Sequence, residues 1–280
     1  MNKKLLASLA LLGSAVTAMA GINVSQPVKI STGDAPAHNP VLSPDGSMIL
    51  FSSDDQTGLN LLNVRDGKIM NIENDVRGAG FTPVFTADNK AVVYQTAKTI
   101  DGLMNRDVRT FSIADGSKAQ VAPMSRAAID LKSSAGIKRY AKSNFTSIIL
   151  TDGSEVTELT PLADAHSYLW PSLSPDGKHL LFVEPFKGLF IADADGSNPV
   201  KIADKADFPG WVSNDIISFV TSHDDGYTIL DSTLKVYDLK AGQTTNVTPA
   251  DVLVGEATAA NSTVVYTTLN GEMYSVTVKK

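Results

Sequence analysis

Short apolar runs separated by polar turns recur along this chain at a nearly constant spacing. The segment 39–51, NPVLSPDGSMILF, returns at 170–182 as WPSLSPDGKHLLF, three periods of about 44 residues later. Weaker copies begin at Thr82 and Phe208. In each copy a short strand ends at a turn, where proline fixes φ and glycine accepts a positive φ, and an apolar strand runs back beside it. Units of this length predict the blades of a β-propeller.

A second hairpin follows in most units, because Asp-Gly pairs stand between apolar runs at 66–67, 115–116, 152–153 and 195–196. Each unit is therefore predicted to be a four-stranded antiparallel blade. The apolar second strands of the units lie at 48–51, 91–94, 137–141, 179–182, 216–219 and 263–266. The third unit has Ser-Ala-Gly in place of the Pro-Asp-Gly turn. The pattern predicts an all-β fold, a six-bladed β-propeller.

The two ends of the chain are expected to close the ring. The last unit stops at its third strand, whereas the segment 27–30, PVKI, repeats the segment 199–202, which is the fourth strand of its own unit. The N-terminal strand, residues 22–30, is thus predicted to complete the last blade and to remove the exposed sheet edges. With no internal boundary in the pattern, residues 21–280 are predicted to form a single domain.

The first 20 residues have the pattern of a secretory signal peptide. Lys3 and Lys4 precede an apolar run at 5–16, and Ala18-Met19-Ala20 supplies the small residues of a cleavage site. A transmembrane anchor is the alternative, but the run is short for a bilayer core of about 30 Å. No transmembrane segment is expected in the mature chain. We therefore expect an exported protein that begins at Gly21 and is periplasmic, with release from the cell as the alternative.

Charge and cysteine content narrow the classes of function. The formal net charge of −6 becomes −8 without Lys3 and Lys4, because 22 basic and 30 acidic residues then remain. An acidic protein is disfavoured as a nucleic-acid binder, since phosphates require clustered Lys and Arg. The chain has no cysteine. Disulfides, a thiol nucleophile and a thiolate metal site are therefore excluded.

The repeat resembles a known family. The run LSPDG, an apolar strand and then DADGSNPVKI is similar to the TolB-type propeller repeat, a WD40-like repeat of bacterial periplasmic proteins. Residues 170–202 match it almost throughout, residues 39–72 well, and the other units loosely. TolB itself carries an α/β domain ahead of its propeller, and here the repeats follow the leader closely, so the resemblance does not extend to TolB proper. It implies an envelope protein whose disc binds an envelope or secreted protein or another envelope component.

Motifs of catalysis are absent from the sequence. It contains no Gly-x-Ser-x-Gly elbow, no phosphate-binding glycine-rich loop and no His-Glu-x-x-His segment. The run 193–198, DADGSN, has its glycine at the wrong position for an EF-hand calcium loop, so it is interpreted as a hairpin turn. We expect no enzyme activity, no cofactor and no metal. A site assembled from separate blades would leave no local motif and stays open as an alternative.

One face of the disc is the expected binding surface. In a propeller the links into the innermost strands and the loops after the second strands share a face, here called the mouth face. An insertion at 96–107 is expected to leave on it. Trp170 and Trp211 have packing between blades as their alternative role. The candidate rim residues are His38, Asp54, Asp55, Arg106, His166, Tyr168, Trp170, Trp211, His223, Asp224 and Asp225.

The leading hypothesis is a non-catalytic periplasmic propeller that binds a protein or envelope component through the mouth face, because aromatic residues beside charges suit protein recognition. The main alternative is a channel-site enzyme or small-ligand receptor, such as a lyase or hydrolase acting on an extracellular sugar or peptide. His223-Asp224-Asp225 is its most suggestive group. A third hypothesis is an accessory subunit for a separate peptidase.

Overall fold

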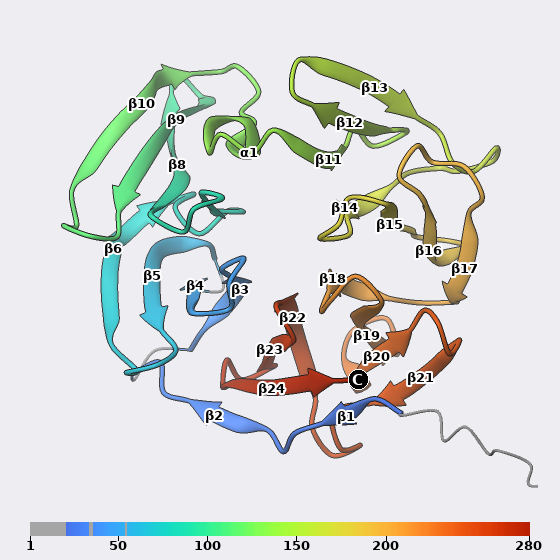
Figure 1. The fold of residues 1–280 in the computed structure, drawn as a ribbon. Coiled ribbons are helices and arrows are strands. Elements are labelled where there is room, and N and C mark those ends of the chain that lie inside the picture. Colours follow the sequence, from blue (N-terminus) through green and yellow to red (C-terminus); the bar gives the residue numbers. More distant parts are fainter. Residues whose placement is uncertain (1–20, 34–35, 54) are drawn as a thin grey trace, which may run out of the picture.

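Six antiparallel sheets surround a central axis in the computed structural model, which describes residues 21–33, 36–53 and 55–280 (Figure 1). The predicted signal peptide, residues 1–20, lies outside the described residues. Chain order runs around the ring, so that neighbouring units in sequence are neighbouring blades in space. The molecule is a six-bladed β-propeller, as the repeat pattern predicts.

Four of the blades are regular four-stranded meanders, ordered from the axis outward. The first holds β3 (His38–Leu42), β4 (Met48–Ser52), β5 (Thr57–Asn63) and β6 (Ile69–Arg77), and the second holds β7 (Val84–Phe85), β8 (Ala91–Ile100), β9 (Leu103–Ser112) and β10 (Lys118–Ser125). The fourth holds β14 (Leu169–Leu173), β15 (His179–Glu184), β16 (Gly188–Asp193) and β17 (Val200–Ala203), and the fifth holds β18 (Asp207–Trp211), β19 (Ile216–Asp224), β20 (Ile229–Asp238) and β21 (Gln243–Asn246).

The sixth blade contains both ends of the described chain. Its first three strands are β22 (Val254–Ala260), β23 (Thr263–Thr268) and β24 (Met273–Lys279), and β1 (Asn23–Val24) and β2 (Val28–Ile30) both pair with β24. Asn23 lies opposite Lys279 and Ile30 lies opposite Met273, so the N-terminal segment follows β24 along its length. The predicted closure of the ring is therefore confirmed.

The third blade differs from the predicted meander in one position. Its sheet has three strands, β11 (Arg139–Ser143), β12 (Ile148–Asp152) and β13 (Glu155–Leu159), and the short helix α1 (Leu131–Ser134) stands where an innermost strand is expected. Figure 1 shows α1 on the inner side of the ring, beside β11. Asp130 begins the helix by accepting a hydrogen bond from the Ser133 N–H. The missing innermost strand explains why the sequence repeat is weakest here.

The Ser-Pro-Asp-Gly repeat is held by one hydrogen-bond network that recurs between blades. In the fourth blade the Ser174 hydroxyl donates to Asp176 Oδ1 at 2.7 Å and accepts from the His179 N–H at 3.0 Å. Ser43 makes the equivalent bonds in the first blade, to Asp45 and Met48. These bonds tie the first strand of a blade to its second, and this network accounts for the repeated serine and aspartate.

The innermost strands also share a kink near the channel. Asn39, Thr82, Trp170 and Phe208 have φ values between 48° and 52°, and each precedes a proline. The strand pairing shifts register across this position in the first, fourth and fifth blades. Proline cannot donate to a neighbouring strand, so the ladder is interrupted at this position and resumes beyond it.

The core lies between adjacent blades. Between the first and second blades, for example, Leu50, Leu59 and Leu61 pack with Val92 and Tyr94. Between the sixth and first, Val265 and Met273 pack with Leu42 and Ile49, which seals the closing interface. Among the described residues no helix is both long and apolar enough to cross a membrane.

Replacing Ser174 with alanine is expected to lower the free energy of unfolding by about 1–2 kcal/mol, because the half-buried His179 N–H loses its side-chain acceptor. Ser117→Ala is the matched control, since that exposed hydroxyl donates to Asp115 in the equivalent outer turn, and a change below about 0.5 kcal/mol is expected. Urea denaturation measures both. Equal losses in the two variants would contradict the role assigned to the repeat serine.

Candidate functional site

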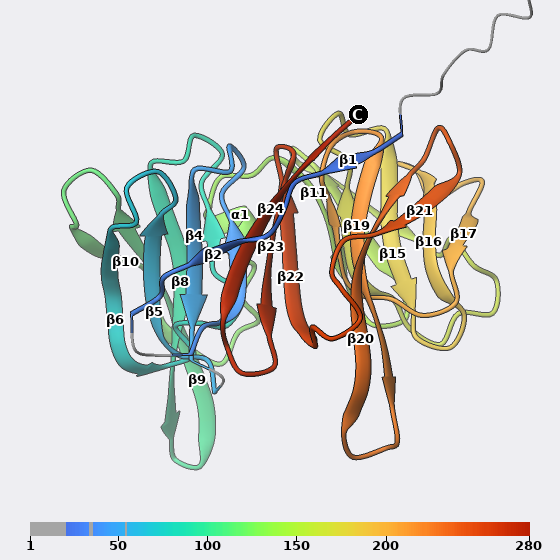
Figure 2. The same ribbon diagram turned by 90° about the horizontal axis from the view of Figure 1, so that it is seen from below.

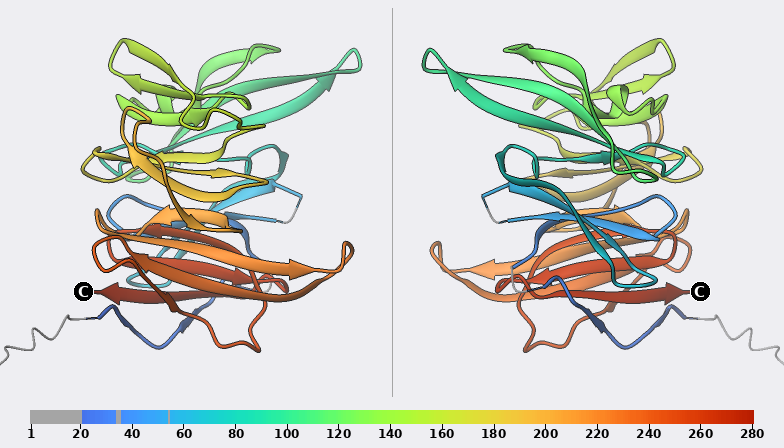
Figure 3. Two further views of the ribbon diagram at one scale, coloured as in Figure 1. Left: turned by 90° about the vertical axis from the view of Figure 1, so that its right-hand side faces the viewer. Right: turned by 90° about the vertical axis from the view of Figure 1, so that its left-hand side faces the viewer.

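Two long hairpins project from the mouth face. β8 and β9 pair without interruption from Ala91–Ser112 to Ile100–Leu103, and β19 and β20 extend from Ile216–Asp238 to Asp224–Ile229. Figures 2 and 3 show both hairpins leaving the same side of the disc, opposite the C-terminus. The insertion expected at 96–107 is thus a regular extension of a blade. Because the second and fifth blades are three apart in a ring of six, the hairpins flank the channel from opposite sides.

Exposed apolar side chains cluster on this face. Phe145 is 78% exposed, Phe186 79% and Tyr227 99%, each in the loop after the second strand of its blade. The loops and hairpin tips of the second to sixth blades carry Ile100, Leu103, Phe145, Phe186, Tyr227, Leu230 and Leu269. Phe81, in the link from the first blade to the second, is exposed as well. We call these eight residues the apolar rim. Several exposed apolar side chains on one face of a soluble protein can mark an interaction site.

The aromatic residues predicted from the sequence for the rim are Tyr168, Trp170 and Trp211. Tyr168 is fully buried, and its hydroxyl donates to the Leu162 carbonyl at 3.1 Å. Trp211 is 6% exposed and its Nε1 donates to the Ser172 carbonyl at 3.4 Å, between the fourth and fifth blades. Tyr168 and Trp211 therefore belong to the core, and the expectation that they form an exposed rim does not hold. Tyr168 precedes an innermost strand and Trp211 ends one, and at both positions the side chain packs between blades.

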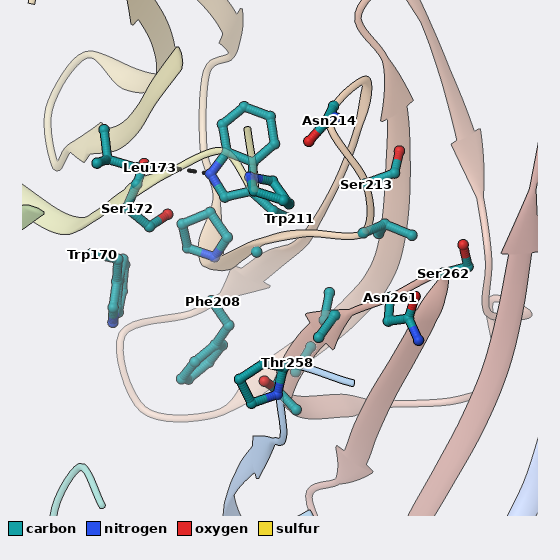
Figure 4. Close-up of a pocket in the computed structure, with 18 residues that line it drawn as sticks. Trp170, Ser172, Leu173, Phe208, Trp211, Ser213, Asn214, Thr258, Asn261 and Ser262 are labelled. Carbon is teal, nitrogen blue, oxygen red and sulfur yellow. Dashed lines mark hydrogen bonds between the residues drawn. The ribbon is translucent and has the colours of Figure 1, made fainter. Parts of the chain in front are cut away.

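Trp170 faces the central channel and is 41% exposed. Its ring lies 5.6 Å from that of Phe208 on the next blade, and the two side chains lie together at one side of a cavity of about 690 Å³ (Figure 4). The innermost strands of the fourth, fifth and sixth blades form most of the wall, with hydroxyl and amide groups from residues such as Ser172, Thr258 and Asn214. The lining residues that the structure describes include no charged side chain. The cavity suits an uncharged group.

The histidines named from the sequence do not come together. His166 Nδ1 lies 3.4 Å from Glu184 Oε1, and His223 Nδ1 lies 3.6 Å from Asp231 Oδ2. Both imidazoles are more than two-thirds exposed, and His38 belongs to β3 of another blade. Across residues 21–33, 36–53 and 55–280, no three His, Asp or Glu side chains are placed to hold a metal ion.

The acidic rim residues stabilise turns. Asp55 accepts hydrogen bonds from Ser53 and Thr57, which lower the pKa of its carboxyl to about 2. Asp225 accepts from the backbone N–H groups of Thr228 and Tyr227, and Asp224 accepts from that of Gly226. Asp54 lies outside the described residues. The side chain of Arg106, the remaining candidate, lines a separate recess in the channel wall.

Glu184 is a buried carboxylate near this face that was not among the rim residues predicted from the sequence. It is fully buried at the end of β15 and accepts hydrogen bonds from the backbone N–H groups of Phe186 at 2.8 Å and His166 at 3.0 Å. Burial raises the pKa of the Glu184 carboxyl, but these N–H groups and the His166 ring lower it more, and the net shift is downward. Glu184 thereby ties the Phe186 loop to the link that enters the fourth blade.

The comparisons with known proteins bear on the fold. No protein-family model matches the chain, and no curated protein matches it in sequence. Among solved structures it is similar to a putative TolB from Agrobacterium tumefaciens, with 16% identity over 92% of this chain and 98% of that one and a TM-score of 0.57. Virginiamycin B lyase from Staphylococcus aureus gives 12% identity, 92% and 99% coverage and 0.56. A chain of the mitotic checkpoint complex gives 10% identity, 100% coverage of both and 0.61.

These likenesses agree on one point. The chain has a β-propeller fold. Its structural neighbours include both a TolB-like protein and a lyase, so the fold is shared by proteins of different function.

Replacing Glu184 with glutamine is expected to lower stability by about 2 kcal/mol at pH 7, because two backbone N–H groups lose a charged acceptor. A carboxyl with a lowered pKa stabilises the fold above its ordinary pKa and loses that contribution as the pH falls through the folded-state value. The difference between wild type and Glu184→Gln should therefore shrink as the pH falls from about 5 to about 3.

Urea denaturation across this pH range measures the effect. Glu158→Gln, an exposed position on β13, is the control and is expected to change stability by less than about 0.5 kcal/mol at every pH. A Glu184→Gln effect that stayed constant between pH 7 and pH 3 would contradict the role of the ionised carboxylate.

Proposed function

We propose that this chain is a non-catalytic binding protein that holds a protein partner against its mouth face. The observation that carries the proposal is the apolar rim, in which the loops of five successive blades each present an exposed apolar side chain. Large aromatic side chains are favoured in protein interfaces, since rigid rings bury much area at a small cost in side-chain entropy.

The shape of the face supports a protein partner over a small one. The two projecting hairpins stand on opposite sides of the channel, with Ile100 and Leu103 on one tip and Tyr227 and Leu230 near the other. A partner seated between them would contact both tips and the shorter loops of the third and fourth blades together. Such a contact covers several blades, as interfaces of standard size require.

The proposal extends to the setting in which the protein works. The TolB-type resemblance of the repeats and the signal-peptide pattern of residues 1–20 support an exported envelope protein whose partner is another envelope or secreted protein.

Mutation of the rim tests the proposal directly. A tagged protein is crosslinked in its source cells and the copurifying proteins are quantified for the wild type and for the double variant Phe186→Ser/Tyr227→Ser. Loss of two interface aromatics is expected to reduce recovery of the partner by about tenfold or more. Val156→Ser/Val200→Ser is the matched control, because both valines are exposed on outer strands away from the rim.

The control is expected to recover the partner at the wild-type level, and unchanged melting temperatures show that both double variants fold. Recovery that is equal in all three proteins, or a loss as large in the valine variant as in the aromatic one, would contradict a mouth-face interface.

A second candidate function is that of a small-ligand receptor or lyase-like enzyme in the channel. The uncharged cavity beside Trp170 and Phe208 favours a neutral ligand, and the structural likeness to virginiamycin B lyase gives a precedent for propellers that act on small molecules. Undiminished partner recovery in the Phe186→Ser/Tyr227→Ser variant would bring this candidate forward.

Export is tested by the N-terminus of the mature protein. Expression of the full chain in a bacterium with a periplasm is expected to yield a periplasmic protein whose first residues are Gly21-Ile22, because cleavage follows Ala20. Edman sequencing and cell fractionation measure this. Deletion of residues 2–20 should leave the protein in the cytoplasm, and a full-length chain found in the membrane fraction would contradict the leader.

A further inference from the structure

The place of the missing innermost strand in the third blade is a recess in the channel wall. The recess has a volume of about 780 Å³ and lies between β9, the segment leading into α1, and β11. α1 and the segment before it fill the position of the strand incompletely. This recess is separate from the uncharged cavity of the fifth blade, although Trp170 lines both.

Basic side chains outnumber acidic ones among the charged residues of its lining. Arg106, Arg126, Lys132 and Lys142 face a single acidic residue, Asp130. The whole chain has a formal net charge of −6, so the recess has the opposite sign of charge to the chain as a whole. Charges of one sign inside a concave, partly apolar wall focus the field on the space between them.

The one carboxylate of the recess is already occupied. Asp130 accepts hydrogen bonds from the Ser133 N–H and from the Tyr140 hydroxyl, and it forms an ion pair with Lys142. Asp130 and Lys142 therefore compensate each other. Arg106 and Arg126 have no acidic partner in the recess, and Lys132 shares Asp130 with Lys142.

The two arginines are free to bind. Neither Arg106 nor Arg126 forms a hydrogen bond or ion pair through its side chain with any residue that the structure describes. Lys132 Nζ donates to the Ala141 carbonyl at 2.9 Å, which uses one of its three donors. Burial and the nearby Lys142 lower the pKa of Lys132, whereas Asp130 raises it, and the net shift is downward. Burial is the largest of these causes, and an added anion would stabilise the charged form of Lys132.

We propose that the recess binds a small organic anion whose carboxylate or phosphate group is held by Arg106 and Arg126, with Lys132 beside them. Guanidinium groups bind both anions through paired, charge-assisted hydrogen bonds. The exposed faces of Phe81 and Trp170 complete the wall and suit an apolar or ring-shaped body. The volume lies within the range of about 300–1,000 Å³ that is typical of small-molecule sites.

Calorimetric titration with three related sugars tests the proposal. Glucose 6-phosphate carries a phosphate, glucuronate carries a carboxylate, and glucose carries neither, so the comparison isolates the anionic group. All titrations use the same ionic strength, because exposed charges are screened by salt. Saturable binding is expected for at least one of the two anions, and the anion that binds more tightly identifies the preferred group. Glucose is expected to show none.

Single charge removals locate the site. Arg106→Gln and Arg126→Gln are each expected to weaken binding of the anionic sugar by about tenfold or more, as loss of hydrogen bonds from a charged group predicts. Arg65→Gln is the matched control, because Arg65 is exposed in an outer turn of the first blade and does not line the recess. Its affinity should equal that of the wild type.

The proposal is overturned if neither anion saturates the protein, if glucose binds as well as the anions do, or if Arg65→Gln weakens binding as much as the recess variants. Anion binding unchanged in both Arg106→Gln and Arg126→Gln would overturn it too. The result is independent of the mouth-face partner, because the Phe186→Ser/Tyr227→Ser variant keeps the whole recess and should bind the anion normally.

Discussion

Antiparallel pairing between the two ends of the chain is the constraint on which the rest of the structure depends. β1 and β2 lie along β24, and Lys29 Nζ contacts Glu272 Oε1 at 2.5 Å across this seam. The pairing gives the last blade its outer strand, and the apolar cluster of Leu42, Ile49 and Val265 joins that blade to the first. A ring closed in this way leaves no long free edge between blades and holds each blade at a fixed angle to its neighbours.

The closed ring also explains why the residues of the apolar rim lie on one face of the disc. An exposed aromatic residue in a single hairpin would be unremarkable, since isolated apolar residues are common on protein surfaces. Here the ring brings the same loop of successive blades to one face, so that Phe145, Phe186 and Tyr227 lie on that face although they are distant in sequence. The irregular third blade contributes the basic recess, because α1 stands where the other blades have an innermost strand. The repeated loops of the blades carry the apolar rim, and the irregular third blade carries the recess.

Sequence repetition was enough to predict the fold. The Ser-Pro-Asp-Gly turns recur because each makes the same local hydrogen bonds, as Ser43 and Ser174 show, and local bonds leave a local pattern. The residues of the candidate site were harder to predict from the sequence. Trp211 is an aromatic residue next to an innermost strand, and only the packing of neighbouring blades shows that it is buried. Phe145 and Phe186 stand alone in short turns, where an aromatic residue between two strands was the available signal. The recess exists because the third blade lacks its innermost strand. In the sequence, that absence appears only as a weak match to the repeat.

Site-specific photocrosslinking tests most directly whether the mouth face is the working surface of this propeller. A benzophenone amino acid is placed at Phe145, Phe186 or Tyr227, and at Val156 or Val200 on the outer strands, in protein produced in its source cells. The account predicts that irradiation yields the same crosslinked protein from all three mouth positions and none from the outer ones. A crosslinked partner that appears from the outer strands and is absent from the mouth positions would contradict it.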